Sequence, residues 1–182
     1  MIKFVQISIF LIIIIALTDC TETSDTSTKR LPDTLLKGVT PDQIGWDLEV
    51  FFVDSSFTKA ILHAKRGRIY QNRMETKLDG GMRVDFFSQA SKGRVSYLTA
   101  DSAVVDDRTK NMIARGHVFV YADSSKATLN TSVLQWNNTT QKIFSTAYVV
   151  FNRPGEKLQG WGFESDQNLN NYKIYKVSGV EK

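Results

Sequence analysis

Apolar and polar residues alternate along most of the chain from about residue 46 onward, with the period of two that is typical of half-buried β-strands. Val84 and Phe86 form one such apolar pair, separated by a charged residue. Val118 and Val120 form another. No long stripe with helical spacing interrupts this pattern. The alternation therefore predicts an all-β fold.

Short polar segments separate the predicted strands. Asp and Asn are frequent in them, and their side chains bond to the nearby backbone and tolerate left-handed geometry. We expect chain reversals at four of these segments, residues 54–56, 78–81, 106–111 and 137–140.

The predicted strands also repeat. A shift of 31 positions needs no gap and carries Leu98 to Leu129, Val105 to Trp136, Met112 to Ile143, Val118 to Val149 and Val120 to Phe151. A looser copy lies upstream around Leu62 and Val84, and a degenerate one follows from Leu158. Each unit is a strand, a turn and a second strand. Chance agreement between β-rich segments is the alternative, but repeats of this length usually stack to bury a shared apolar face. We therefore expect a twisted, open β-jelly roll built from repeated strand pairs.

Matching positions of the repeats share one phase, so they are expected to line a common interior. Two interpretations of this interior stay open: a close-packed core, or a slot that accepts acyl chains. Large aromatic residues, including Phe87, Phe119, Phe144 and Trp161, could belong to either. The candidates for a lipid groove are Leu62, Val84, Phe86, Leu98, Val118, Val120, Leu129, Trp136, Ile143, Val149 and Phe151.

The first 20 residues have the pattern of an export signal. A short basic start precedes an apolar run that is shorter than the roughly 20 residues of a membrane span. Leu17, Thr18, Asp19 and Cys20 follow, an order that resembles a bacterial lipobox apart from the acidic residue before the cysteine. We expect Cys20 to be acylated; an incidental thiol beside an uncleaved anchor is the alternative. Residues 21–45 are predicted to be a flexible tether, and residues 46–182 the folded domain.

The composition limits the kinds of chemical site that the chain could contain. Cys20 is the single cysteine, so an intramolecular disulfide framework is excluded, and the two histidines lie far apart without clustered acids. The chain has no serine-nucleophile or zinc-hydrolase motif, so we expect neither an enzyme nor a bound metal or cofactor. The net charge of +4 is spread along the chain and predicts no nucleic-acid interface.

The terminal strands of an open jelly roll are left unpaired, and their backbone groups are available to a neighbouring sheet. Lys173, Lys176 and Lys182 are expected to limit uncontrolled pairing at the last strand.

Several of these segments together resemble the LptC family over residues 47–180. The segments are Leu98-x-Ala100-Asp101, Ala114-x-Gly116-His117-Val118-x-Val120, Leu129-x-Thr131 through Trp136, and Leu158-Gln159-Gly160-Trp161-Gly162. The resemblance implies an OstA-like β-jelly roll on the periplasmic side of the inner membrane. It further implies receipt of lipopolysaccharide from an ATP-binding-cassette transporter of the LptB, LptF and LptG type, and delivery to an LptA-type bridge protein. Gly160 matches the family's C-terminal glycine, near the region that docks the bridge.

Many members of that family keep an uncleaved transmembrane helix, whereas the expected acylation of Cys20 would give this chain a lipid anchor. The alternative function is that of a structural or polysaccharide-binding envelope lipoprotein, with a closed β-sandwich that holds no lipid and aromatic residues that face outward.

Overall fold

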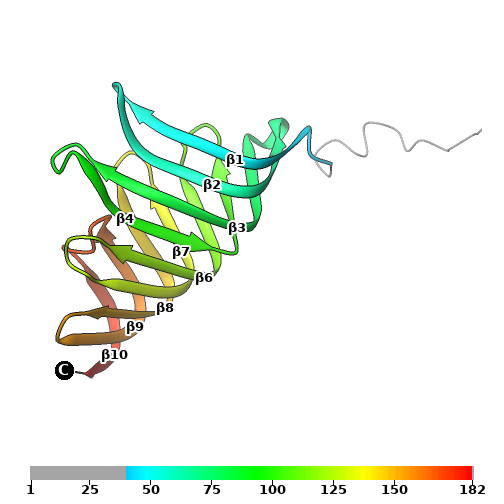
Figure 1. Ribbon diagram of the computed structural model, residues 1–182. Helices are drawn as coiled ribbons and strands as arrows, with labels where there is room; N and C mark the ends of the chain where they lie inside the picture. Colours follow the sequence, from blue (N-terminus) through cyan, green and yellow to red (C-terminus); the bar gives the residue numbers. More distant parts are fainter. Residues whose placement is uncertain (1–39, 182) are drawn as a thin grey trace, which may run out of the picture. The chain divides into compact units, whose positions relative to one another are not determined.

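The computed structural model describes residues 40–181, which form a single antiparallel β-sheet (Figure 1). Within this range one short 3-10 helix is present, and no helix is long and apolar enough to cross a membrane. The elements are β1 (Gln43–Asp54), β2 (Phe57–Tyr70), η1 (Gln71–Arg73), β3 (Glu75–Ser88), β4 (Gly93–Ala100), β5 (Ser102–Asp106), β6 (Met112–Ala122), β7 (Thr128–Asn137), β8 (Lys142–Arg153), β9 (Glu156–Asp166) and β10 (Lys173–Glu181).

The order of strands in the sheet follows the chain, from β1 at one edge to β10 at the other. β4 and β5 lie end to end, because β3 and β6 both pair with each of them. Asp101 separates the two, so they act as one long strand with a break. Apart from this break between β4 and β5, each strand is joined to the next by a short reversal, and the all-β prediction is confirmed.

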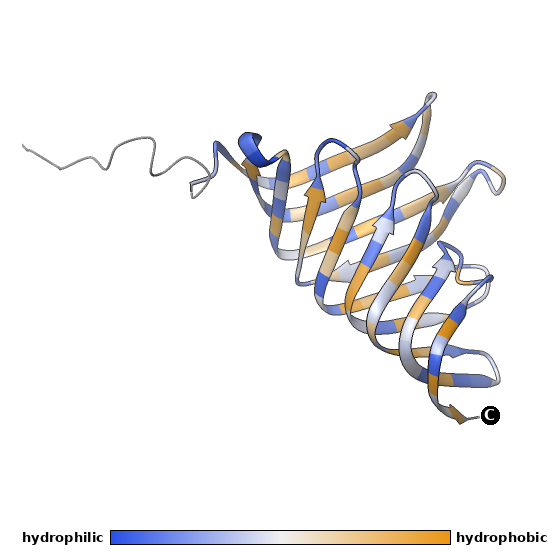
Figure 2. Cartoon of the chain, turned by 180° about the vertical axis from the view of Figure 1, so that it is seen from behind, coloured by the Kyte–Doolittle hydropathy of each residue, from blue (hydrophilic) through white to orange (hydrophobic). Residues whose placement is uncertain are grey.

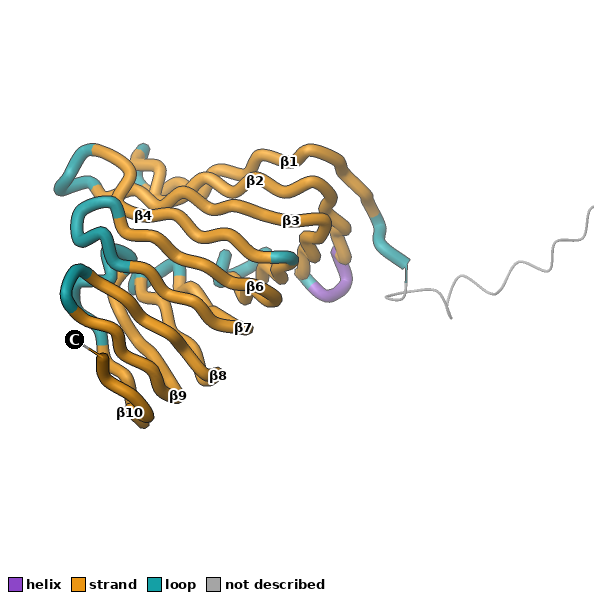
Figure 3. Tube along the Cα trace, turned by 60° about the horizontal axis from the view of Figure 1, so that its bottom comes forward, coloured by secondary structure: helices purple, strands orange, loops and turns teal. Residues whose placement is uncertain are grey.

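Most strands bend near their middle, and the bends lie beside one another. The pairing register slips at Ala64–Arg66 in β2, Arg115–Val118 in β6, Thr131–Gln135 in β7 and Ser145–Tyr148 in β8. Such bulges bend a strand and increase its twist. Because the bends are aligned, the sheet folds over into two layers (Figures 2 and 3).

We name each layer by the short strand it contains. The β4 layer comprises residues 48–54, 57–64, 82–88, 93–100, 118–122, 128–131, 148–153 and 156–160. The β5 layer comprises residues 43–46, 66–70, 75–79, 102–106, 112–115, 133–137, 142–145 and 162–166.

The bend at Asp101 depends on the absence of a side chain at Gly116. The amide of Gly81 donates to the carbonyl of Asp101 at 3.0 Å, and the amide of Asp101 donates to the carbonyl of Gly116 at 3.0 Å. Gly116 has a φ of +74°, and a Cβ there would lie 2.3 Å from the Asp101 carboxylate. Glycine meets both requirements.

The predicted turn at residues 78–81 is wrong. These residues lie inside β3, where Gly80 and Gly81 have φ values of +81° and +93°. The two glycines bend the strand from one layer into the other but do not reverse it, which gives the aligned bend of β3. The other three predicted reversals, at residues 54–56, 106–111 and 137–140, are confirmed.

The core lies between the two layers. Trp136 of the β5 layer contacts two rings of the β4 layer, Phe52 at a centroid distance of 5.3 Å and Phe86 at 5.4 Å. Burial of a large apolar side chain stabilises the fold by about 1.5–3 kcal/mol. The two layers are therefore held together mainly by their apolar inner faces.

The structure also explains the repeat of 31 residues. Leu98 and Leu129 lie in the β4 layer on β4 and β7, and Val105 and Trp136 lie in the β5 layer on β5 and β7. Each repeat therefore crosses from one layer to the other, turns and returns. The predicted pattern of stacked strand pairs is confirmed.

Candidate functional site

All the residues predicted to share an interior lie in one buried cluster. The structure places them between the layers, on β2, β3, β4, β6, β7 and β8. None of their side chains is more than 1% exposed. They are Leu62, Val84, Phe86, Leu98, Val118, Val120, Leu129, Trp136, Ile143, Val149 and Phe151.

The other large aromatic residues differ from this group. Phe87, Phe119 and Phe144 are half-buried on the outer faces of their strands, and Trp161 is exposed. Strand phase explains the difference for the first two. Phe87 follows the inward Phe86, and Phe119 lies between the inward Val118 and Val120.

The open sides of the two layers meet along a line that we call the mouth, formed by the chain reversals of each layer. The reversals of the β4 layer are residues 55–56, 89–92, 123–127 and 154–155, and those of the β5 layer are residues 71–74, 107–111, 138–141 and 167–172.

Three hydrogen bonds between described residues cross the mouth. The Lys59 ammonium donates to the Asn138 carbonyl at 3.5 Å, the Ser125 hydroxyl donates to the Asn168 carbonyl at 3.3 Å, and the Tyr172 hydroxyl donates to the Glu156 carboxylate at 3.3 Å. Next to Asn168, Leu169 is 2% exposed and belongs to the core. The contacts made by Lys59 and Ser125 are individually weak, since a hydrogen bond typically contributes only about 0.5–1.5 kcal/mol net.

A hollow of about 230 Å³ opens beside β1, at the end of the mouth nearest this edge strand. Its floor consists of core side chains from both layers, including Phe52, Leu62 and Leu78. Asp107 and Lys110 lie at its polar rim. The hollow thus connects the surface to the apolar interior.

Four polar atoms of buried residues in the inward phase make no hydrogen bond among the described residues. They are the indole Nε1 of Trp136, the hydroxyl oxygens of Ser96 and Ser165, and the side-chain amide nitrogen of Gln167. Ser165 pairs with Ile143, which in turn pairs with Trp136, so the two polar groups lie on one row of the β5 layer. The sequence analysis did not single out the two serines. Each could have been found in the sequence as a polar residue at a strand position whose alternation places its side chain toward the interior.

Both edges of the sheet carry exposed apolar side chains. On β1 these are Ile44, Trp46, Val50, Phe51 and Val53, and on β10 they are Tyr175, Val177 and Val180. The expected unpaired terminal strands are therefore present, since β1 and β10 each pair with one neighbour among the described residues. Lys173 and Lys176 lie on β10, and Lys182 lies outside the described residues.

Gly160 controls how β10 packs against β9. Its buried backbone pairs with Val177, and a Cβ on Gly160 would lie 2.3 Å from the carbonyl oxygen of Lys176 and 2.8 Å from Ile174. A backbone atom cannot move aside as a flexible side chain can. Gly160 therefore allows β10 to approach β9 closely at the edge of the sheet.

Charged pairs cover the outer faces of the strands. Asp79 on β3 accepts hydrogen bonds from Arg66 at 2.5 Å and from Arg68 at 2.8 Å, both on β2. The hydrogen bond from Arg66 holds the pKa of the Asp79 carboxyl below its ordinary value, and Arg68 acts in the same direction. These residues tie β2 to β3 on the side away from the interior.

Residues 40–181 contain no group of three or more His, Cys, Asp or Glu side chains arranged to hold a metal ion. Cys20, the lipobox-like segment before it and most of the predicted tether lie outside the described residues. The sheet begins at Gln43, three residues before the predicted start of the domain.

Comparison with known protein families matches residues 8–180 to a family described as lipopolysaccharide-assembly, LptC-related. A search of curated proteins found no match. The family match spans nearly the whole chain, including every strand that forms the interior and both edges. The chain therefore belongs to the LptC family, whose members act in lipopolysaccharide transport with the other Lpt proteins in the periplasmic part of the cell envelope.

Proposed function

We propose that the chain receives lipopolysaccharide from an inner-membrane ATP-binding-cassette transporter of the LptB, LptF and LptG type and passes it to an LptA-type bridge protein. The acyl chains would lie between the β4 and β5 layers. The observation that carries this proposal is the continuous apolar interior, which runs from β2 to β9; among the described residues, none of those buried in the fold is charged.

In this proposal lipid enters at the β1 end of the sheet and leaves at the β10 end. The hollow beside β1 supports entry there, because it already reaches Phe52 and Leu62 from outside. The unpaired backbone of β10 supports exit at the other end, because a partner strand can pair with it and continue the sheet. The interior would then extend into that of the partner.

The interior is packed in this structure, so the layers must separate along the mouth to admit acyl chains. Three hydrogen bonds and the packing of Tyr172 on Phe151 hold the mouth among the described residues, whereas the aligned bends hold the opposite side through continuous backbone. The free hydroxyl and indole groups of Ser96, Ser165 and Trp136 would then meet the ester and amide oxygens at the base of the acyl chains, which are hydrogen-bond acceptors.

We also propose that acylated Cys20 retains the protein at the inner membrane. Each buried acyl CH₂ contributes about 0.8 kcal/mol, and more than one chain anchors stably. Cys20→Ala should release the protein from membranes in cell fractionation. Continued retention would favour an uncleaved apolar anchor.

Photo-crosslinking tests the interior directly. A photoreactive residue at Leu129 should give a lipopolysaccharide adduct in cells, whereas the same residue at Lys126 should give none. The two positions are three residues apart, but Leu129 is fully buried and Lys126 is exposed. Adducts from Lys126 alone would refute an interior lipid site and favour a closed structural lipoprotein.

A further inference from the structure

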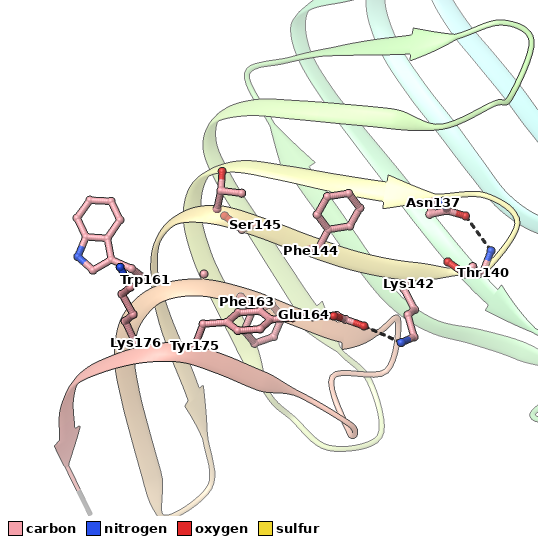
Figure 4. Close-up of a pocket in the computed structure, with 12 residues that line it drawn as sticks. Asn137, Thr140, Lys142, Phe144, Ser145, Trp161, Phe163, Glu164, Tyr175 and Lys176 are labelled. Atoms are coloured by element: carbon pink, nitrogen blue, oxygen red, sulfur yellow. Dashed lines mark hydrogen bonds and ion pairs between the residues drawn. The ribbon is translucent and has the colours of Figure 1, made fainter.

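A second hollow lies on the outside of the sheet, over β8, β9 and β10 near their bends (Figure 4). Its volume is about 850 Å³, within the range of about 300–1,000 Å³ of small-ligand sites. The residues along it include Lys142, Phe144, Trp161, Glu164, Tyr175 and Lys176.

The two ends of this outer hollow differ in chemistry. Trp161 and Lys176 lie at one end, and the ion pair between Lys142 and Glu164 lies at the other (Figure 4). Phe144 is half-buried, and its ring and that of Tyr175 also line the wall. Aromatic surface is thus flanked by groups that donate and accept hydrogen bonds.

Trp161 offers a ring face on which a ligand could stack. It is 53% exposed, slightly less than Tyr175 at 56%, and its contact with Tyr148 is edge-on, with a centroid distance of 5.5 Å and an interplanar angle of 69°. Tyr175 is less available, because Lys173 lies over its ring and Gly162 lies against it.

The charged side chains that line the outer hollow are Lys142, Glu164 and Lys176, so two positive charges stand against one negative charge. Glu164 accepts from Lys142 at 2.6 Å and from the Tyr175 hydroxyl at 2.9 Å, so its carboxylate is already satisfied. Lys176 forms no ion pair with the side chains that the structure describes. An anionic group near Trp161 could therefore bind Lys176 without displacing another acid.

We infer that this outer hollow binds an anionic saccharide, one bearing phosphate or carboxylate groups. The apolar C–H face of a sugar ring packs well on the electron-rich face of an aromatic ring, and its hydroxyl groups need the mixed donors and acceptors found here. An acyl chain would leave the polar ends of the hollow unpaired. A β-strand partner would pair with the edge of β10 and would not need the faces of β8 and β9.

Two sources could supply such a saccharide, the sugar portion of lipopolysaccharide or the glycan strands of the cell wall. The site goes beyond the proposed transport function, because it lies outside the layers and needs no lipid in the interior. Crosslinking at Leu129 tests the interior separately, so the failure of one proposal is distinguishable from the failure of the other.

Calorimetric titration of the detergent-solubilised full chain tests the inference. The probes are phosphorylated oligosaccharide freed of its acyl chains from lipopolysaccharide, cell-wall glycan fragments, and a neutral glucose oligomer. We expect saturable binding of at least one of the first two, which identifies the source, and at least tenfold weaker binding of the neutral oligomer.

Trp161→Ala should weaken saccharide binding at least tenfold, whereas Trp46→Ala should leave it unchanged. Trp46 is the matched control because it is also exposed but lies on β1. Lys176→Gln should reduce affinity for the anionic saccharide severalfold, with Lys65→Gln as its control. The inference is overturned if no saccharide binds saturably, or if the two tryptophan variants behave alike. It is also overturned if Trp161→Ala spares saccharide binding and abolishes co-purification of a protein partner.

Discussion

The ring of Phe52 packs edge-on against the ring of Trp136, with a centroid distance of 5.3 Å and an interplanar angle of 86°. The two residues belong to opposite layers, so this contact lies across the space that the proposed function assigns to acyl chains. Trp136 also touches Phe86, so it links the layers through two aromatic contacts, as Phe151 does through Phe163 and Tyr172.

Replacement of Trp136 by alanine should therefore destabilise the fold strongly. Loss of a fully buried tryptophan typically costs about 3–5 kcal/mol. Trp46→Ala should change the free energy of unfolding by no more than about 0.5 kcal/mol, because Trp46 is 66% exposed. Urea denaturation of both variants measures the difference. Similar unfolding midpoints would show that Trp136 does not hold the layers together.

A covalent link across the mouth should block transport. Ser125→Cys with Asn168→Cys places two thiols where a hydrogen bond now joins the reversals of opposite layers. A short, reducible thiol crosslinker should stop lipopolysaccharide export, and reduction should restore it. Cys20 is the only native cysteine.

The control for this experiment is a link along one side of the mouth. Lys92→Cys with Lys126→Cys joins two reversals of the β4 layer and leaves the layers free to separate. Export that continues with the first pair fully crosslinked would argue against separation of the layers along the mouth.

Gly160→Ala should disturb the last strand more than the core. The added Cβ would meet the Lys176 carbonyl, so β10 must move away from β9. We expect co-purification with the bridge protein to fall at least tenfold, with a loss of stability of about 1–3 kcal/mol. Gly179→Ala is the control, because its nearest neighbour would be 4.0 Å away on the same pair of strands. Equal partner recovery from the two variants would contradict a role for close β9–β10 packing.

Gly116→Ala should be more harmful than Gly155→Ala. Both residues have positive φ, +74° and +80°, so both substitutions introduce backbone strain of about 1–2 kcal/mol. Only the first adds a clash, with the carboxylate of Asp101. Thermal unfolding should show the larger decrease for Gly116→Ala, and a reversed order would mean that the bend at Asp101 adjusts easily.

Acid should weaken the fold through Asp79. Because its pKa in the folded protein is lowered by Arg66 and Arg68, its contribution to stability is fully present above the unfolded pKa of about 3.9. The contribution is lost as the pH falls through the lower folded value. Asp79→Asn should therefore lose less stability than the wild type between pH 7 and pH 3, as measured by urea titration at each pH. An equal loss would assign acid sensitivity to other carboxyls.

The interior could be predicted from the sequence because a strand has a fixed period of two. Aligning Leu98 with Leu129 in the repeat of 31 residues places every matched apolar residue on the inward side of its strand, and all of these residues are buried. The family resemblance, based on short segments around Gly116 and Gly160, was confirmed by the match over residues 8–180.

The bends were harder to predict, because a glycine pair reads equally well as a reversal or as a kink within one strand. The sequence analysis assigned residues 78–81 to a reversal. The pairing of β3 with both β4 and β5 identifies them as a kink within one strand. Trp161 was likewise not predicted to be exposed. Its neighbour Gly162 has a φ of +77°, which interrupts the alternation at that point.

The antiparallel pairing has a consequence for how molecules of this kind could be joined. Among the described residues, the path from β1 to β10 omits β5 and so contains an odd number of strands, which makes the two edge strands point in the same direction. A protein of the same fold that continued the sheet from β10 in the same orientation would therefore meet it with a parallel first strand. Parallel pairs have slanted hydrogen bonds and are slightly less stable per residue. Residue for residue, such a junction would therefore be held less tightly than the antiparallel pairs within the domain.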